Sequence, residues 1–263
     1  NHSYMGIIEA LVLGLVQGLT EFIPVSSSGH LILAHELFGT TESTLLFDVA
    51  LHIGTLLALI IFFWNDLLKL AKNSLSKNSE GKLARIIILA TIPAALIGFL
   101  FSDWIDSTLR KPVTVAVTMI IMGLLMLGVE KYSSKKRNIS SVSLLDGLYV
   151  GFAQALALIP GVSRSGATIT AGMARGLSRA DAARFSFLMA VPITLGAIVG
   201  SLISAESGEL SGQNGVFLIG IVASLISGIV AIRFLLKFLS TNSLAVFAYY
   251  RIALALIVFL TLL

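Results

Sequence analysis

The stretch "EFIPVSSSGH", residues 21–30, decides the fold because it interrupts a segment that is otherwise apolar. Within ten residues it places a carboxylate, a proline, three serines, a glycine and a histidine. Proline ends a helical hydrogen-bond ladder, and serine favours the first position of a new helix. The apolar stretch 6–38 therefore predicts two short helices separated by a polar break.

The composition places the chain in a membrane. Of its 263 residues, 56% are hydrophobic and 12% charged, with a mean hydropathy of +0.95, whereas soluble domains carry about 25% charged residues. The absence of cysteine excludes disulfides and thiolate metal sites. The "NHSY" before Met5 is interpreted as a non-native remnant, and no cleavable signal peptide is predicted.

A second stretch repeats the first one at an offset of 137 residues. "EALVLGLVQGLTEFIPVSSSG" begins at Glu9, and "DGLYVGFAQALALIPGVSRSG" begins at Asp146. In both copies the acidic residue precedes a glutamine by eight positions, and that glutamine precedes a serine by nine. Residues 144–176 therefore predict a second broken pair of helices.

Six further segments have the length of a membrane-spanning helix, which needs about 20 apolar residues. They are 45–64, 84–102, 112–130, 183–203, 215–238 and 244–263. We interpret 6–38 and 144–176 as re-entrant helical hairpins that enter and leave on one side. The predicted fold is an all-α polytopic membrane protein of one integral-membrane domain, residues 1–263, with six transmembrane helices and two re-entrant hairpins.

The two halves, about 6–133 and 144–263, form an inverted-topology repeat in this prediction. Each half holds one hairpin and three spans, so the second half enters the membrane in the opposite direction. Two lysine-rich loops, 65–83 and 131–143, are expected on the cytoplasmic side of a cell membrane. The acidic loop 204–214, both termini and the opening of the first hairpin are then expected on the outer face.

Gln17 and Glu21 lie four residues apart and therefore share one helix face, which should look into the bundle. One interpretation is a buried pair that holds two helices together. The other is an oxygen-ligand site for Mg²⁺ or Ca²⁺, with the remaining ligands supplied by water or by phosphate.

The serines before each new helix predict an anion site. Ser26, Ser27, Ser28 and Gly29 stand at the first helix start, and Ser163, Ser165, Gly166 and Thr168 surround Arg164 at the second. Helix N-termini bind anions, and arginine binds phosphate through its planar fork. Two such starts converging at mid-membrane fit pyrophosphate, although close packing of small residues is the simpler interpretation of either motif alone.

His30 lies one turn into the first new helix and suggests phosphoanhydride chemistry. It could take a proton from Ser27 as a general base or act as the nucleophile; Ser27 and water are the other candidates. Asp48 and His52, which share a face of the first span, are weaker candidates for the site.

The motifs "QGLTE" (17–21), "PVSSSGH" (24–30) and "PGVSRSGAT" (160–168) resemble the undecaprenyl-pyrophosphate phosphatase family, the BacA or UppP type associated with bacitracin resistance. The resemblance runs from about residue 6 to the end. It implies a metal-dependent membrane phosphatase that hydrolyses a polyprenyl pyrophosphate to the monophosphate and recycles the lipid carrier for cell-wall synthesis. By motif match the catalytic residues are Glu21, Ser27, His30 and Arg164.

The resemblance also implies the partners. These are the polyprenyl pyrophosphate and membrane lipids, with no nucleic acid, and a homodimer stays open. Many relatives have glutamate where this chain has Gln17, so weaker metal binding is expected here. The alternative function is a transporter or flippase for an anionic polyprenyl lipid, because inverted repeats with half-helices facing an anion are also typical of transporters.

Overall fold

The computed structural model describes residues 6–38, 45–204 and 214–261, and in these ranges the chain is helical and has no strand. The residues "NHSY" and nearly all of the predicted outer loop 204–214 lie outside them. The helices are α1 (Ile7–Phe22), α2 (Ser27–Phe38), α3 (Leu45–Phe62), α4 (Trp64–Asn73), α5 (Ser79–Leu109), α6 (Pro112–Tyr132), α7 (Leu144–Leu156), α8 (Arg164–Ala174), α9 (Arg179–Ser204), α10 (Asn214–Thr241) and α11 (Ala245–Thr261), with a 3₁₀ turn η1 at Ile139–Ser141.

Four of the predicted spans are long, apolar helices in the described residues, namely Ser79–Ile105, Pro112–Tyr132, Arg179–Ile203 and Gly215–Thr241. The first predicted span, 45–64, continues into α4 through a bend of 76°, and the bent pair would make a fifth crossing. The last predicted span is the shorter apolar helix α11. The all-helical membrane fold is confirmed at this level.

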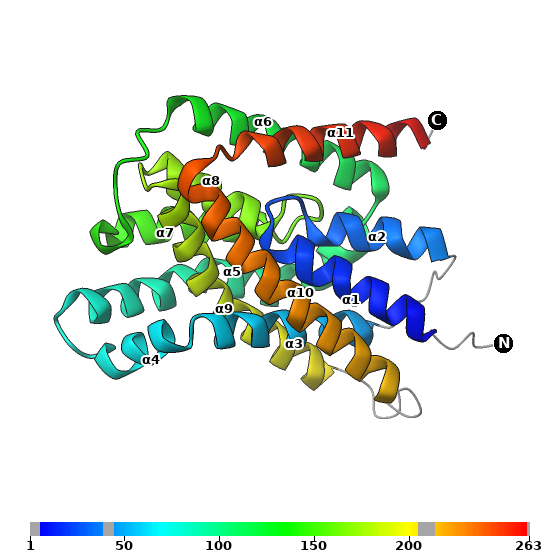
Figure 1. Ribbon diagram of the computed structural model, residues 1–263, viewed down its shortest axis with the longest axis horizontal. Coiled ribbons are helices and arrows are strands. Elements are labelled where there is room, and N and C mark those ends of the chain that lie inside the picture. Colours follow the sequence, from blue (N-terminus) through cyan, green and yellow to red (C-terminus); the bar gives the residue numbers. More distant parts are fainter. Residues whose placement is uncertain (1–5, 39–44, 205–213, 262–263) are drawn as a thin grey trace.

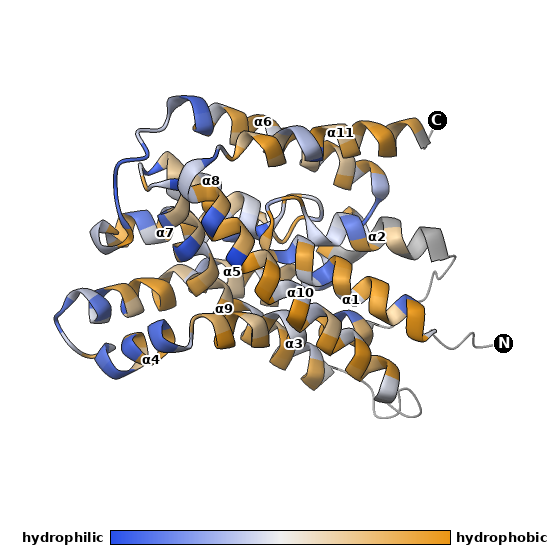
Figure 2. Ribbon diagram, in the orientation of Figure 1, coloured by the Kyte–Doolittle hydropathy of each residue, from blue (hydrophilic) through white to orange (hydrophobic). Residues whose placement is uncertain are grey.

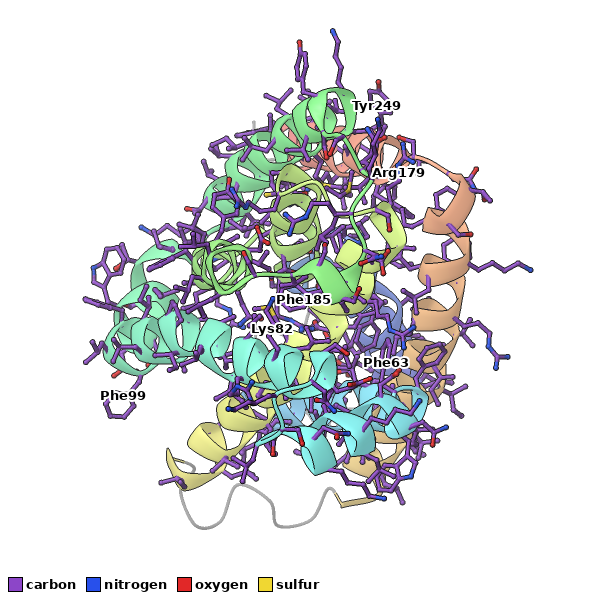
Figure 3. The ribbon with its side chains drawn as sticks, turned by 90° about the vertical axis from the view of Figure 1, so that its left-hand side faces the viewer. Phe63, Lys82, Phe99, Arg179, Phe185 and Tyr249 are labelled. Atoms are coloured by element: carbon purple, nitrogen blue, oxygen red, sulfur yellow. The ribbon has the colours of Figure 1, made fainter. Side chains whose placement is uncertain are left out.

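The outer surface of the bundle is apolar, as a membrane-embedded surface requires. Phe99 is 85% exposed and projects from the edge of the bundle, whereas Phe185 is fully buried in its interior (Figure 3). Hydrophobic residues cover most helices along their length, and hydrophilic residues gather at one end of the molecule (Figure 2). A helix that is apolar on all sides is stable only when protein or lipid surrounds it.

Both predicted breaks are present. α1 ends at Phe22 and α2 begins at Ser27, with Pro24 in the turn between them; α7 ends at Leu156, and α8 begins at Arg164 after Pro160. Pro24 and Pro160 offer no N–H to continue a helical ladder. Each break therefore stands where the sequence predicts it.

The helices that carry the breaks pack on long apolar helices from the other half of the chain. α1 packs mainly on α10, and α7 packs mainly on α5. The close approach requires glycine at Gly18, where a Cβ atom would lie 2.0 Å from the Ser227 hydroxyl, and at Gly151, where it would lie 2.3 Å from the Ala90 carbonyl. α6 lies beside α11 across the top of the bundle (Figure 1).

Ion pairs join the elements at the hydrophilic end. Asp146, at the start of α7, accepts hydrogen bonds from Arg137 at 2.6 Å and from Arg175 at 2.7 Å, and the bond to Asp146 raises the pKa of Arg137. Arg179 pairs with Glu130 of α6. These contacts fix the ends of α7, α8 and α9 relative to one another, and thereby the second break.

Candidate functional site

Glu21 is the centre of a buried polar cluster where the two breaks meet. Its Oε2 accepts a hydrogen bond of 2.7 Å from the hydroxyl of Ser27, and its Oε1 accepts one of 2.8 Å from Nη2 of Arg164. The Arg164 side chain is 15% exposed and that of Glu21 is 9% exposed. A carboxylate, a hydroxyl and a guanidinium from two distant segments are therefore in direct contact.

Gln17 extends this cluster toward α3. Its Nε2 donates to Glu21 Oε2 at 3.2 Å and to Nδ1 of His52 at 3.1 Å. Because the Glu21 carboxylate can only accept, the amide nitrogen must face it, and the buried Oε1 has no hydrogen-bond partner in the structure. His52, a weaker candidate in the sequence, thus contacts the site, while Asp48 lies 3.9 Å from Arg110.

Two serines with the same unusual backbone begin the new helices. Ser26 has φ +76° and accepts from the Gly29 amide at 3.3 Å; Ser163 has φ +73° and accepts from the Gly166 amide at 3.1 Å. Left-handed backbone is costly for a residue other than glycine and collects at functional sites. The predicted serine caps are confirmed at both breaks.

In each break, the serine two residues after the cap contacts the opposite break. Ser28 lies 3.1 Å from the Ser26 hydroxyl and accepts from the Gly161 amide at 3.5 Å. Ser165 lies 3.2 Å from the Ser163 hydroxyl and donates to the Ile23 carbonyl at 3.3 Å. The two breaks are therefore in direct contact with each other.

Thr168 is buried behind the second helix start. Its hydroxyl donates to the Arg164 carbonyl at 2.7 Å and lies 2.6 Å from the hydroxyl of Ser186 on α9. Thr168 therefore fixes the backbone that presents Arg164, and the substrate-binding role expected from its motif stays a prediction.

His30 has other partners than Ser27. Its Nδ1 lies 2.7 Å from the Ser26 carbonyl, and its Nε2 lies 2.8 Å from the hydroxyl of Tyr250 on α11. Both ring nitrogens are thus engaged, and the hydroxyl of Ser27 is turned to Glu21. In this arrangement the group placed to take a proton from Ser27 is Glu21.

Arg251 is a site residue that the motifs did not reveal. It is fully buried, and its guanidinium donates to the carbonyls of Gly161 at 2.5 Å, Val162 at 3.0 Å and Pro24 at 3.4 Å. One side chain therefore holds the backbones of both breaks. The signal was present, because an arginine inside the apolar stretch 244–263 is a functional candidate by position alone.

We expect Arg251→Met to lower the melting temperature of the solubilised protein by about 6–24 °C. The variant loses at least two charge-assisted hydrogen bonds, worth ~1.5–3 kcal/mol each, at ~2–4 °C per kcal/mol. Thermal unfolding followed by intrinsic fluorescence measures the shift. Arg233→Met is the matched control, since Arg233 is exposed on α10; equal shifts in the two variants would contradict the role of Arg251.

The cluster offers few metal ligands. Among the described residues no three histidine, aspartate or glutamate side chains lie together as a metal site. The fitting donors are the carboxylate of Glu21 and the orphaned Oε1 of Gln17. Hard cations such as Mg²⁺ accept such incomplete oxygen sets and complete them with water and substrate phosphate.

A multi-helix membrane protein with a buried acid–serine–arginine cluster between two broken helices is the class that this fold and site define. Within that class, the chain belongs to the family described as "Bacitracin resistance protein BacA", which matches residues 10–257. It is 44% identical over 253 residues to the protein of Moorella thermoacetica named undecaprenyl-diphosphatase, covering 95% of this chain and 96% of the relative. The undecaprenyl-diphosphatase of Thermodesulfovibrio yellowstonii is also 44% identical, covering 97% of this chain and 96% of the relative.

Proposed function

We propose that this protein is an undecaprenyl-diphosphatase, which removes the terminal phosphate of the lipid diphosphate and leaves the lipid monophosphate for reuse in cell-wall synthesis. The family and the names of its relatives support this activity. The observation that carries it to individual residues is the contact of Glu21 with both Ser27 and Arg164. Phosphoryl transfer needs a nucleophile, a proton acceptor and fixed positive charge, and this cluster provides all three.

Ser27 is the nucleophile that this geometry favours. Its oxygen forms a bond to the terminal phosphorus while its proton passes to Glu21 along the existing 2.7 Å hydrogen bond. The bond between that phosphorus and the bridging oxygen breaks, and the bridging oxygen leaves on the lipid monophosphate. Water then attacks the phosphoserine and gives a proton to Nε2 of His30, the bond between phosphorus and the Ser27 oxygen breaks, and inorganic phosphate leaves. The Ser27 oxygen takes back the proton held by Glu21, and His30 releases its proton to solvent.

Arg164 stabilises the charge on the transferred phosphoryl group. Its Nη2 is held by Glu21, whereas its buried Nη1 has no hydrogen-bond partner in the structure. A buried donor without a partner is costly, and a phosphate oxygen would satisfy it. The serine-capped starts of α2 and α8 add their helix dipoles to the same place.

Glu21 and Gln17 Oε1 are the residues that would hold Mg²⁺ or Ca²⁺. When bound, such an ion supplies positive charge next to the phosphate oxygens. Gln17→Glu adds a carboxylate to the metal site, so we expect tighter Mg²⁺ binding. In a melting-temperature titration, the Mg²⁺ concentration that gives half of the maximal stabilisation should fall about tenfold.

Gln154→Glu is the control for that substitution, because Gln154 occupies the matching position of the second repeat and is equally buried. Both variants bury a new carboxylate, so a general cost of burying charge is common to them. A metal response that is the same in both variants would remove Gln17 from the metal site.

The arrangement of helices supports an inverted repeat of two hairpins and six spans. α1 on α10 in one half corresponds to α7 on α5 in the other, and α6 pairs with its own counterpart α11. The start of α1 and the end of α11 lie at one end of the bundle, opposite the lysine-rich loops (Figure 1). With those loops in the cytoplasm, the termini and the first hairpin face outward.

The second candidate is a flippase for the same lipid, favoured by the meeting of two broken helices inside the bundle. Proteoliposomes that contain the polyprenyl diphosphate separate the two functions. A phosphatase releases one inorganic phosphate for each lipid monophosphate formed, and Ser27→Ala abolishes both products. Lipid that crosses the bilayer with its diphosphate intact would favour the flippase.

A further inference from the structure

The pair formed by His30 and Tyr250 joins the first break to the other end of the chain. The phenol hydroxyl lies 2.8 Å from Nε2 of His30, and the two rings are nearly parallel, with centroids 5.7 Å apart and an interplanar angle of 7°. Tyr250 is 48% exposed. No motif of the sequence indicated this tyrosine, because its partner is 220 residues away.

The contacts of His30 fix which nitrogen exchanges a proton. Nδ1 lies 2.7 Å from the Ser26 carbonyl, which can only accept, so Nδ1 carries a hydrogen. Nε2 is then the nitrogen that gains or loses a proton, and the Tyr250 hydroxyl is its partner. A phenol can donate to neutral imidazole and can accept from imidazolium.

We propose that Tyr250 is a positioning residue that holds His30 in one ring orientation while Nε2 exchanges a proton. The hydrogen bond survives in both protonation states, so the imidazole need not reorient beside the substrate. For its effect on turnover this inference rests on the proposed phosphatase activity; the contact itself does not.

The neighbour of Tyr250 explains why α11 is suited to this role. Arg251 holds the carbonyls of both breaks, so the register of α11 against the site is fixed one residue away. The position of the phenol is therefore set by the same contacts that set the break that precedes His30. An exposed tyrosine placed by such a neighbour can make a defined contact without being buried itself.

Turnover is the first test. Tyr250→Phe keeps the ring and removes the hydroxyl, and we expect kcat for phosphate release to fall about 3- to 10-fold, the usual effect of one hydrogen bond, with KM and melting temperature unchanged. Tyr249→Phe is the control, since Tyr249 is 63% exposed. An unchanged kcat in Tyr250→Phe, or a loss seen mainly in KM, would overturn the positioning role.

Chemical labelling tests the contact without any activity. Diethyl pyrocarbonate modifies an unprotonated histidine nitrogen, and peptide mass mapping locates the label on His30. We expect His30 to be labelled several-fold faster in Tyr250→Phe than in wild type, and at the wild-type rate in Tyr249→Phe. Equal rates in all three proteins would overturn the contact; faster labelling together with no phosphate release by wild type would support the contact and contradict only the phosphatase.

Discussion

Arg164→Lys is expected to lower kcat for phosphate release about 100-fold, although the positive charge is retained. The Arg164 guanidinium donates through Nη2 to Glu21 Oε1 at 2.8 Å, and its Nη1 has no hydrogen-bond partner and can donate to a phosphate oxygen. A lysine ammonium is a point charge and cannot hold both partners in the same geometry. Loss of one preorganised donor to a transition-state oxygen costs about 10²–10³ in kcat. Phosphate release by the purified variant measures the effect.

Arg233→Lys is the matched control for Arg164→Lys, because Arg233 is exposed on α10 and lies outside the site. It should leave kcat within about twofold, as surface substitutions away from special features do. Wild-type turnover in Arg164→Lys would contradict the proposed role of the guanidinium fork, because charge alone would then suffice.

Glu21→Gln is expected to lower kcat about 10³-fold, the range seen when a positioned proton acceptor is lost. Glutamine keeps the shape of the side chain and can still accept a hydrogen bond from Arg164. It cannot take the proton that Ser27 now shares with Glu21 Oε2. The melting temperature of the variant should be measured beside its turnover to separate chemistry from folding.

The control for Glu21→Gln is Glu9→Gln, at the other end of the same helix. Glu9 caps the start of α1 through the Gly6 amide, at 3.4 Å, and is far from the breaks in sequence. Turnover near the wild-type value is expected there. If Glu21→Gln retained a tenth or more of the wild-type kcat, Glu21 would not be the proton acceptor.

Local patterns in the sequence predicted the breaks and their caps, and the reason is that these features depend on neighbours in the chain. Pro24 ends the helical hydrogen-bond pattern, and Ser26 and Ser163 cap the helices that follow. Gln17 lies one helical turn from Glu21 whatever the tertiary fold. The repeat at 137 residues also predicted that Arg164 and Glu21 belong to one site.

The partners of Ser27, His30 and Arg251 could not be predicted, because they depend on how distant helices pack. The sequence placed His30 one turn from Ser27. In the structure, the packing of α11 brings the Tyr250 hydroxyl to the His30 imidazole, and the Ser27 hydroxyl donates to Glu21 instead. The helix α4 (Trp64–Asn73) was missed, because residues 65–83 were predicted as a loop. α4 is polar and bends by 76° away from the apolar helix α3, and its Asp66 pairs with Arg184 of α9.

Hydrolysis in water enriched in ¹⁸O tests the central claim most directly, namely that the cluster of Glu21, Ser27 and Arg164 cleaves the terminal phosphate of a lipid diphosphate. The purified protein is given a polyprenyl diphosphate and Mg²⁺, and both products are analysed by mass spectrometry. Attack at the terminal phosphorus predicts one ¹⁸O in the inorganic phosphate, none in the lipid monophosphate, and no products from Ser27→Ala. Label in the lipid product, or intact diphosphate after incubation with the folded wild-type protein, would contradict the claim.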